Sequence, residues 1–231
     1  MRARLVIASD CEDLRVIQTL AKHVGASTVA DEHVVSLVKL SNVNNWAVTE
    51  QLGESLREVL PRNVPAVILL QSGNRSTRKN EAIVKGLSAP GVKVKLWARA
   101  EIENYILDPG TIARVSGAAQ EIVTVKINQI ISNSREATRA IFIAESVASA
   151  QEGYGRETLA LAEEQFDVLW KDHTRRVEVV RGTQVIKELN AWLEHEGYRP
   201  ITAYRLAKGT KPQALVHEML DVLMGIEDLL S

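Results

Sequence analysis

The chain has 231 residues, of which 45% are hydrophobic, and its formal net charge is -1 at pH 7. This length allows a substantial core in one large or two small domains, and the near-zero charge excludes a whole-chain electrostatic attraction to nucleic acid. The single cysteine, Cys11, excludes an internal disulfide framework and a cysteine-based zinc site, and it points to a reduced, cytoplasmic setting.

Strand and helix patterns alternate through the first half of the chain. Branched apolar runs predict strands at residues 4–8, 34–40, 66–70 and 92–97. Apolar positions at helical spacing predict helices at residues 13–24, 45–60 and 77–87. The alternation predicts an α/β fold with a mostly parallel sheet flanked by helices. Because ligands bind at the carboxyl ends of strands in such sheets, we expect a site at residues 71–76 and 99–108.

After Asp108 the spacing of apolar residues becomes helical almost throughout. We therefore expect an α/β domain at residues 1–118 and a mainly helical C-terminal region at residues 119–231 packed on it. The last predicted helix has a broad apolar face between Leu215 and Leu230, which is either core or the surface of a homodimer. No apolar run is long enough to span a membrane, so no membrane partner is expected.

Several segments carry a family resemblance. They are LVIASDCEDLRVIQTL at residues 5–20, ILLQSGNRS at 68–76, WARAEIENYILDP at 97–109 and, more loosely, VVRGTQVIKEL at 179–189. Together they resemble the Toprim domain of OLD-family (overcoming lysogenization defect) nucleases and related ATPase-linked proteins. The third segment is the most specific, because it is similar to the Arg-Glu-Ile-Glu-Asn-Tyr block of that group.

The resemblance implies phosphodiester cleavage with Mg²⁺ or Mn²⁺, held by an early glutamate and by the two aspartates of an Asp-x-Asp motif. In this chain the early glutamate falls on Ala8 or Ser9, and the Asp-x-Asp positions are Gln71 and Gly73. The lysine of the family falls on Thr183. Hard cations need charged oxygen ligands. We therefore expect a degenerate Toprim domain that keeps the fold and has lost nuclease activity.

Other acidic residues lie near the same strand ends. Glu12 and Asp13 follow the first predicted strand, and Glu101 and Glu103 follow the last one. Asp13, Glu101 and Glu103 are the candidate metal ligands, which would give a relocated Mg²⁺ or Mn²⁺ site and an active DNA or RNA endonuclease. The alternative is that Glu12 and Asp13 cap the following helix and that Glu101 and Glu103 pair with nearby arginines.

Four basic residues form a candidate nucleic-acid-binding cluster near the same crevice: Arg75, Arg78, Lys79 and Arg99. They either contact phosphates of DNA or RNA, giving a binding module that does not cut, or form an ordinary solvated face.

The resemblance also implies an ABC-type ATPase, as a domain or a subunit. The chain has no Walker A pattern, so the ATPase is expected on another part of a longer protein or on a separate polypeptide. The expected function is a partner or regulatory module in an ATPase-linked anti-phage or DNA-repair system.

Overall fold

The computed structural model describes residues 5–11, 14–40, 58, 64–75, 77–148 and 156–228. These residues belong to two compact units, each assembled from separate stretches of the chain. Unit 1 comprises Met1–Gln71, Asn80–Trp97 and Thr210–Ser231, and unit 2 comprises Ser72–Lys79 and Ala98–Gly209. The sequence analysis expected one boundary, between residues 118 and 119. In the structure, unit 1 ends at Trp97 and resumes at Thr210, because the final helix returns to it.

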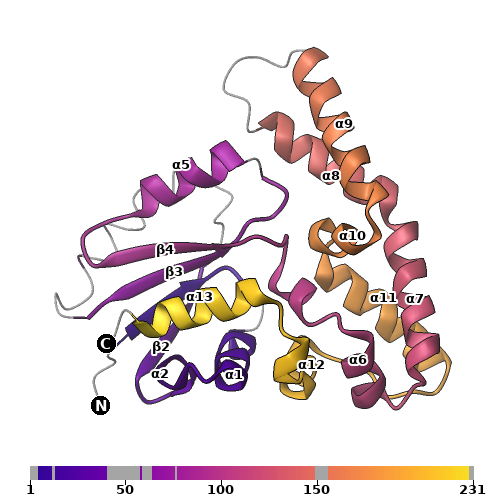
Figure 1. Cartoon of the computed structure of the whole chain (residues 1–231), viewed down its shortest axis with the longest axis horizontal. Coiled ribbons are helices and arrows are strands. Elements are labelled where there is room, and N and C mark those ends of the chain that lie inside the picture. Colours follow the sequence, from indigo (N-terminus) through magenta and orange to yellow (C-terminus); the bar gives the residue numbers. More distant parts are fainter. Residues whose placement is uncertain are drawn as a thin grey trace. The chain divides into compact units, whose positions relative to one another are not determined.

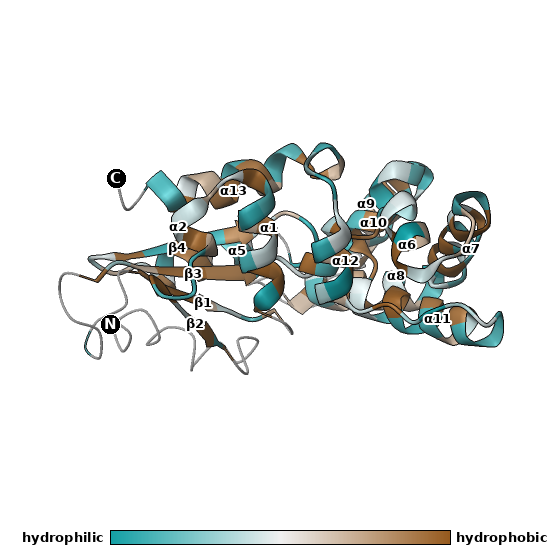
Figure 2. Cartoon of the chain, turned by 90° about the horizontal axis from the view of Figure 1, so that it is seen from below, coloured by the Kyte–Doolittle hydropathy of each residue, from teal (hydrophilic) through white to brown (hydrophobic). Residues whose placement is uncertain are grey.

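Unit 1 is organised around a parallel sheet, which has four strands in the described residues (Figure 1). The strands are β1 (Leu5–Ser9), β2 (Val35–Lys39), β3 (Ala66–Gln71) and β4 (Val92–Trp97), in the order β2-β1-β3-β4. Each neighbouring pair is parallel. The two central strands, β1 and β3, are buried along almost their whole length. Every residue of β3 before Gln71 is apolar (Figure 2). The strand order reverses between β1 and β3, which makes this pair the switch point of the sheet.

Helices cover both faces of this sheet. They are α1 (Arg15–Val24), α2 (Ser27–Ala30), α5 (Thr77–Leu87) and α13 (His217–Glu227). Figure 1 shows α5 on one side of the sheet and α1 and α2 on the other. Right-handed crossovers require this arrangement, because β1 to β2 and β3 to β4 step in opposite directions along the sheet. The helix predicted at residues 45–60 lies almost wholly outside the described residues.

The helix α13 packs against α1, α2 and β4. It buries Met219, Leu223 and Ile226 completely. The apolar face that the sequence leaves open as core or dimer surface is therefore core of unit 1 in its described part. A short 3₁₀ turn, Pro212–Ala214, precedes this helix.

Unit 2 is helical in all its regular described elements. They are the 3₁₀ turn η1 (Ile102–Tyr105) and the helices α6 (Pro109–Ser116), α7 (Gln120–Asn133), α8 (Arg135–Ala148), α9 (Arg156–Lys171), α10 (His173–Val179), α11 (Gly182–His195) and α12 (Ala203–Gly209). The helix α6 begins at Asp108, whose carboxylate accepts a hydrogen bond from Thr111 N at 2.7 Å. The α/β fold with a parallel sheet, flanking helices and a helical C-terminal half is thus confirmed.

Candidate functional site

The carboxyl ends of β1 and β3 meet at the switch point, where an open α/β sheet binds its ligands. Asp10 directly follows β1, and Gln71 is the last residue of β3. The backbone N–H of Gln71 donates to Asp10 Oδ1 at 2.9 Å, and Gln71 Nε2 donates to the Asp10 carbonyl at 3.4 Å. Ser9 is fully buried, and its Oγ accepts from Cys11 N at 3.3 Å. The polar groups at this point tie the two strand ends together.

These residues do not fit the hard-cation site that the resemblance implies. Ser9 and Gln71 are neutral, and Gly73 has no side chain. Asp10 supplies a carboxylate that was not among the predicted site residues, although its place two residues after the predicted strand was the available signal. Among the described residues, no three His, Cys, Asp or Glu side chains come together in a group that could hold a metal ion. The candidates Glu12 and Asp13 lie outside the described residues.

The loop after β3 folds back on the segment after β4. Ser72 Oγ lies 2.9 Å from the Ala98 carbonyl and 3.0 Å from the Arg99 carbonyl. Gly73 adopts φ 56 and donates its N–H to the Ala100 carbonyl at 3.2 Å. Asn74 Nδ2 donates to the Val179 carbonyl at 3.2 Å. These donors are used within unit 2 and are not presented to an anion.

Glu101 caps the helix α11. Its Oε2 accepts from Thr183 N and from Thr183 Oγ1, both at 2.8 Å, and its Oε1 accepts from Arg181 Nε at 3.1 Å. A carboxylate at this position is stabilised by the positive end of the helix dipole. Both oxygens of Glu101 therefore bind the start of α11; the expected pairing with an arginine involves Arg181, and the cap on Thr183 was not predicted. Thr183, the position of the family's lysine, is its direct partner.

The buried side chain of Asn104 also connects η1 to the start of α11. It is 1% exposed, its Nδ2 donates to the Val177 carbonyl and to the Val180 carbonyl at 2.8 Å, and its Oδ1 accepts from Glu101 N at 3.0 Å. Gly182 lies so close that a Cβ there would be 2.7 Å from the Cβ of Glu103 and 3.0 Å from Asn104 N.

We call Glu101, Asn104, Gly182 and Thr183 the η1–α11 clamp. Glu103 packs beside it and is 3% exposed. The segment that most resembles the family is thus built into the core of unit 2, and it does not present Glu101 and Glu103 as an open pair of carboxylates.

The basic cluster is likewise engaged in internal contacts. Arg99 Nη1 donates to the Asn104 carbonyl at 2.6 Å, and its guanidinium lies 4.8 Å from the centre of the Tyr105 ring. Lys79 Nζ lies 3.5 Å from Glu145 Oε2. Arg75 is half-buried, and the side chain of Arg78 lies outside the described residues. Arg99 and Lys79 therefore make contacts within unit 2, and contact of the cluster with phosphates stays a prediction.

No protein-family model, curated protein or solved structure matches this chain. No helix in the part of the chain that the structure describes combines the length and the apolar character needed to cross a membrane.

Proposed function

We propose that this chain is a non-catalytic, Toprim-like module that acts as a partner or regulatory component of an ABC-type ATPase in an anti-phage or DNA-repair system. The proposal is supported by the resemblance of residues 5–20, 68–76 and 97–109 and by a parallel sheet whose switch point lies between β1 and β3. The observation that carries it is the pairing of Asp10 with Gln71, because a neutral amide stands where a metal site needs a second carboxylate.

Charge count is the physical reason for expecting no cleavage. Affinity for Mg²⁺ and Mn²⁺ rises with the number of charged oxygen ligands, and two-metal cleavage needs several carboxylates to stabilise the attacking and leaving oxygens. At the switch point Asp10 offers one carboxylate, and one of its oxygens already accepts the N–H of Gln71. In unit 2, Glu101 directs both oxygens to the N-terminus of α11. Among the described residues, neither arrangement supplies the charge that the reaction requires.

A cleavage assay tests the loss of catalysis. The purified chain is incubated with supercoiled plasmid or single-stranded RNA in Mg²⁺ or Mn²⁺, beside a calorimetric titration with the same ions. We expect no cleavage above the protein-free control and no saturable metal binding at millimolar concentrations. Metal-dependent cleavage that disappears in Asp10→Asn, with the melting temperature unchanged, would show that the chain is an active nuclease.

A matched pair of variants tests whether the missing carboxylate is the cause. Gln71→Asp places a second carboxylate at the end of β3, and Gln71→Asn has the same shape without the charge. We expect the Asp variant to bind Mn²⁺ about tenfold more tightly than the Asn variant, because one added charge near the divalent ion contributes on the order of 1.4 kcal/mol. Equal affinities would mean that these strand ends are not the metal position of a Toprim fold.

The ATPase partnership has its own test. The chain alone is expected to hydrolyse no ATP, because it has no Walker A pattern. Titrating the chain into a purified ABC-type ATPase from the same organism is expected to change the rate of ATP turnover. ATP turnover by the isolated chain would contradict the proposal, and so would ABC-type ATPases that are uniformly indifferent to the chain.

A further inference from the structure

The helix α9 (Figure 1) carries exposed apolar side chains on the side opposite its buried residues. Ala162, Phe166 and Trp170 are buried, at 2%, 0% and 6% exposure. Leu161 and Val168 are 56% and 59% exposed. At 3.6 residues per turn, Leu161 and Val168 lie about 20° apart around the axis and roughly opposite Phe166. The exposed pair is therefore a separate face of the helix.

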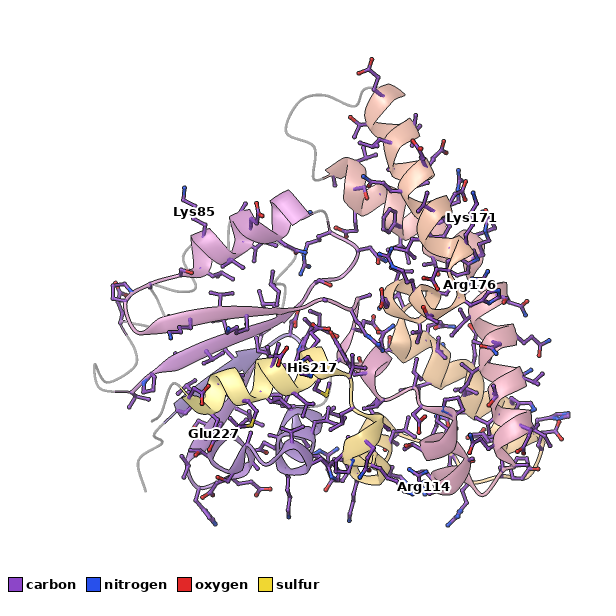
Figure 3. The ribbon with its side chains drawn as sticks, viewed as in Figure 1. Lys85, Arg114, Lys171, Arg176, His217 and Glu227 are labelled. Carbon is purple, nitrogen blue, oxygen red and sulfur yellow. The ribbon has the colours of Figure 1, made fainter. Side chains whose placement is uncertain are left out.

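Charged residues extend this face at regular spacing. Glu157, Leu161, Glu164, Val168 and Lys171 follow one another at intervals of four, three, four and three residues, and all five are exposed. That is the spacing of the contact seam between two helices of a coiled coil. We call these five residues the α9 seam. It begins with an acid and ends with a base, and Figure 3 labels Lys171 at its end.

We propose that the α9 seam pairs with the α9 seam of a second copy of this chain, antiparallel and around a two-fold axis near Glu164. This orientation places Leu161 beside Val168 of the partner subunit, and it brings the end with Glu157 to the end with Lys171 of the partner subunit. A parallel pair would instead place Glu157 against its own copy. Opposed helix dipoles favour the antiparallel pair as well, and a self-complementary two-fold contact is the commonest kind between identical chains.

The flanks of the seam are compatible with this pairing. Glu163 pairs with Arg139 at 2.6 Å, and Asp167 pairs with Arg135 at 2.8 Å, so these acids are neutralised within one chain. Glu164 lies nearest the axis and meets its own copy there, which opposes association. The seam therefore gives a weak dimer that becomes stronger when the charge of Glu164 is removed. The inference does not depend on the proposed function, because no seam residue belongs to the strand ends or to the clamp.

Sedimentation equilibrium of the full chain over a range of concentrations measures the association. We expect a concentration-dependent dimer whose dissociation constant rises about tenfold in Lys171→Glu, where like charges meet at both ends of the seam. The double variant Glu157→Lys with Lys171→Glu reverses both charges and is expected to restore the original value. Glu164→Leu is expected to tighten the dimer by about tenfold, since it replaces a repulsive pair with an apolar contact.

The matched control is Leu159→Ala, because Leu159 is 43% exposed on the same helix but lies on another face. It is expected to leave the dissociation constant unchanged, whereas Leu161→Ala raises it. All substituted positions are exposed, and equal melting temperatures would verify that the variants fold. The proposal would be overturned if the Glu164→Leu variant, like the wild type, stayed monomeric at every concentration. A dimer that tolerates Leu161→Ala, or whose charge reversal is not rescued by the double variant, would overturn it equally.

Discussion

Replacement of Asn104 by alanine tests whether the η1–α11 clamp holds unit 2 together. The side chain is 1% exposed and makes three hydrogen bonds that no other described side chain duplicates in the structure. Two go to carbonyls at the junction of α10 and α11, on Val177 and Val180, and the third comes from the N–H of Glu101. Truncation leaves these three backbone groups without their partner and with little access to water.

The expected loss follows from that count. A hydrogen bond contributes about 1 kcal/mol net, so three lost bonds lower the free energy of unfolding by about 3 kcal/mol. Asn104→Asp keeps the size and the acceptor oxygen, but it replaces the donating amide with an oxygen that faces two carbonyl oxygens. We therefore expect Asn104→Asp to lose more stability than Asn104→Ala, although it is the smaller change in shape.

Urea unfolding followed by far-UV circular dichroism measures the loss, with Asn128→Ala as the matched control. Asn128 is exposed on α7 of the same unit, and its replacement should change the stability by less than about 0.5 kcal/mol. Hydrogen exchange gives a local readout, because the amide of Thr183 should exchange faster when the clamp is loosened. A loss in Asn104→Ala no greater than that of the control, or an aspartate variant more stable than the alanine variant, would refute the reasoning.

Three further predictions concern the same clamp and the last helix. Gly182→Ala should lower the free energy of unfolding by about 1–3 kcal/mol, because a Cβ there would lie 2.7 Å from the Cβ of Glu103. Alanine normally stabilises a helix relative to glycine, so a rise in the urea midpoint would contradict this prediction. Glu101→Gln should lower the free energy of unfolding by about 1 kcal/mol, because the neutral side chain caps Thr183 more weakly. Urea unfolding at low salt measures this loss, and a loss that becomes larger at high salt would argue against a charge effect. Burial raises the pKa of Glu227, but hydrogen bonds from the first turn of α2 outweigh it and hold the pKa below its ordinary value of 4.5. The contribution of this carboxylate is therefore complete above pH 4.5 and is lost as the pH falls through the folded-state pKa, so the melting temperatures of wild type and Glu227→Gln should differ at pH 7 and converge in acid.

Most of the fold could be predicted from local patterns. The strands β1, β2, β3 and β4 fall within one residue or so of the apolar runs that predicted them, because a buried strand needs an unbroken run of branched side chains. The helices α1 and α5 follow from apolar spacing, and Pro90-Gly91 marks the turn before β4. Each of these signals lies within a few residues of the structure it determines.

The assignment of side-chain roles could not be predicted in the same way. Sequence alone left Glu101 as either a metal ligand or the partner of a nearby arginine, and the Thr183 that it caps is 82 residues away. The resemblance places a metal ligand at Gln71, but the hydrogen bond from Gln71 N–H to Asp10, 61 residues earlier, became visible only in the assembled sheet. The partners of these polar groups are set by which strand ends and helix ends meet.

The sequence by itself determined the element types and the parallel sheet, because these depend on residue identity and short-range spacing. Only the tertiary structure decided that the final helix joins the N-terminal unit. There Glu227, labelled in Figure 3, accepts the N–H of Thr28, 199 residues away. The tertiary structure also decided that the most family-like segment is a buried clamp. The physical reason is that hydrogen-bond partners and burial depend on contacts between distant segments, which no local pattern encodes.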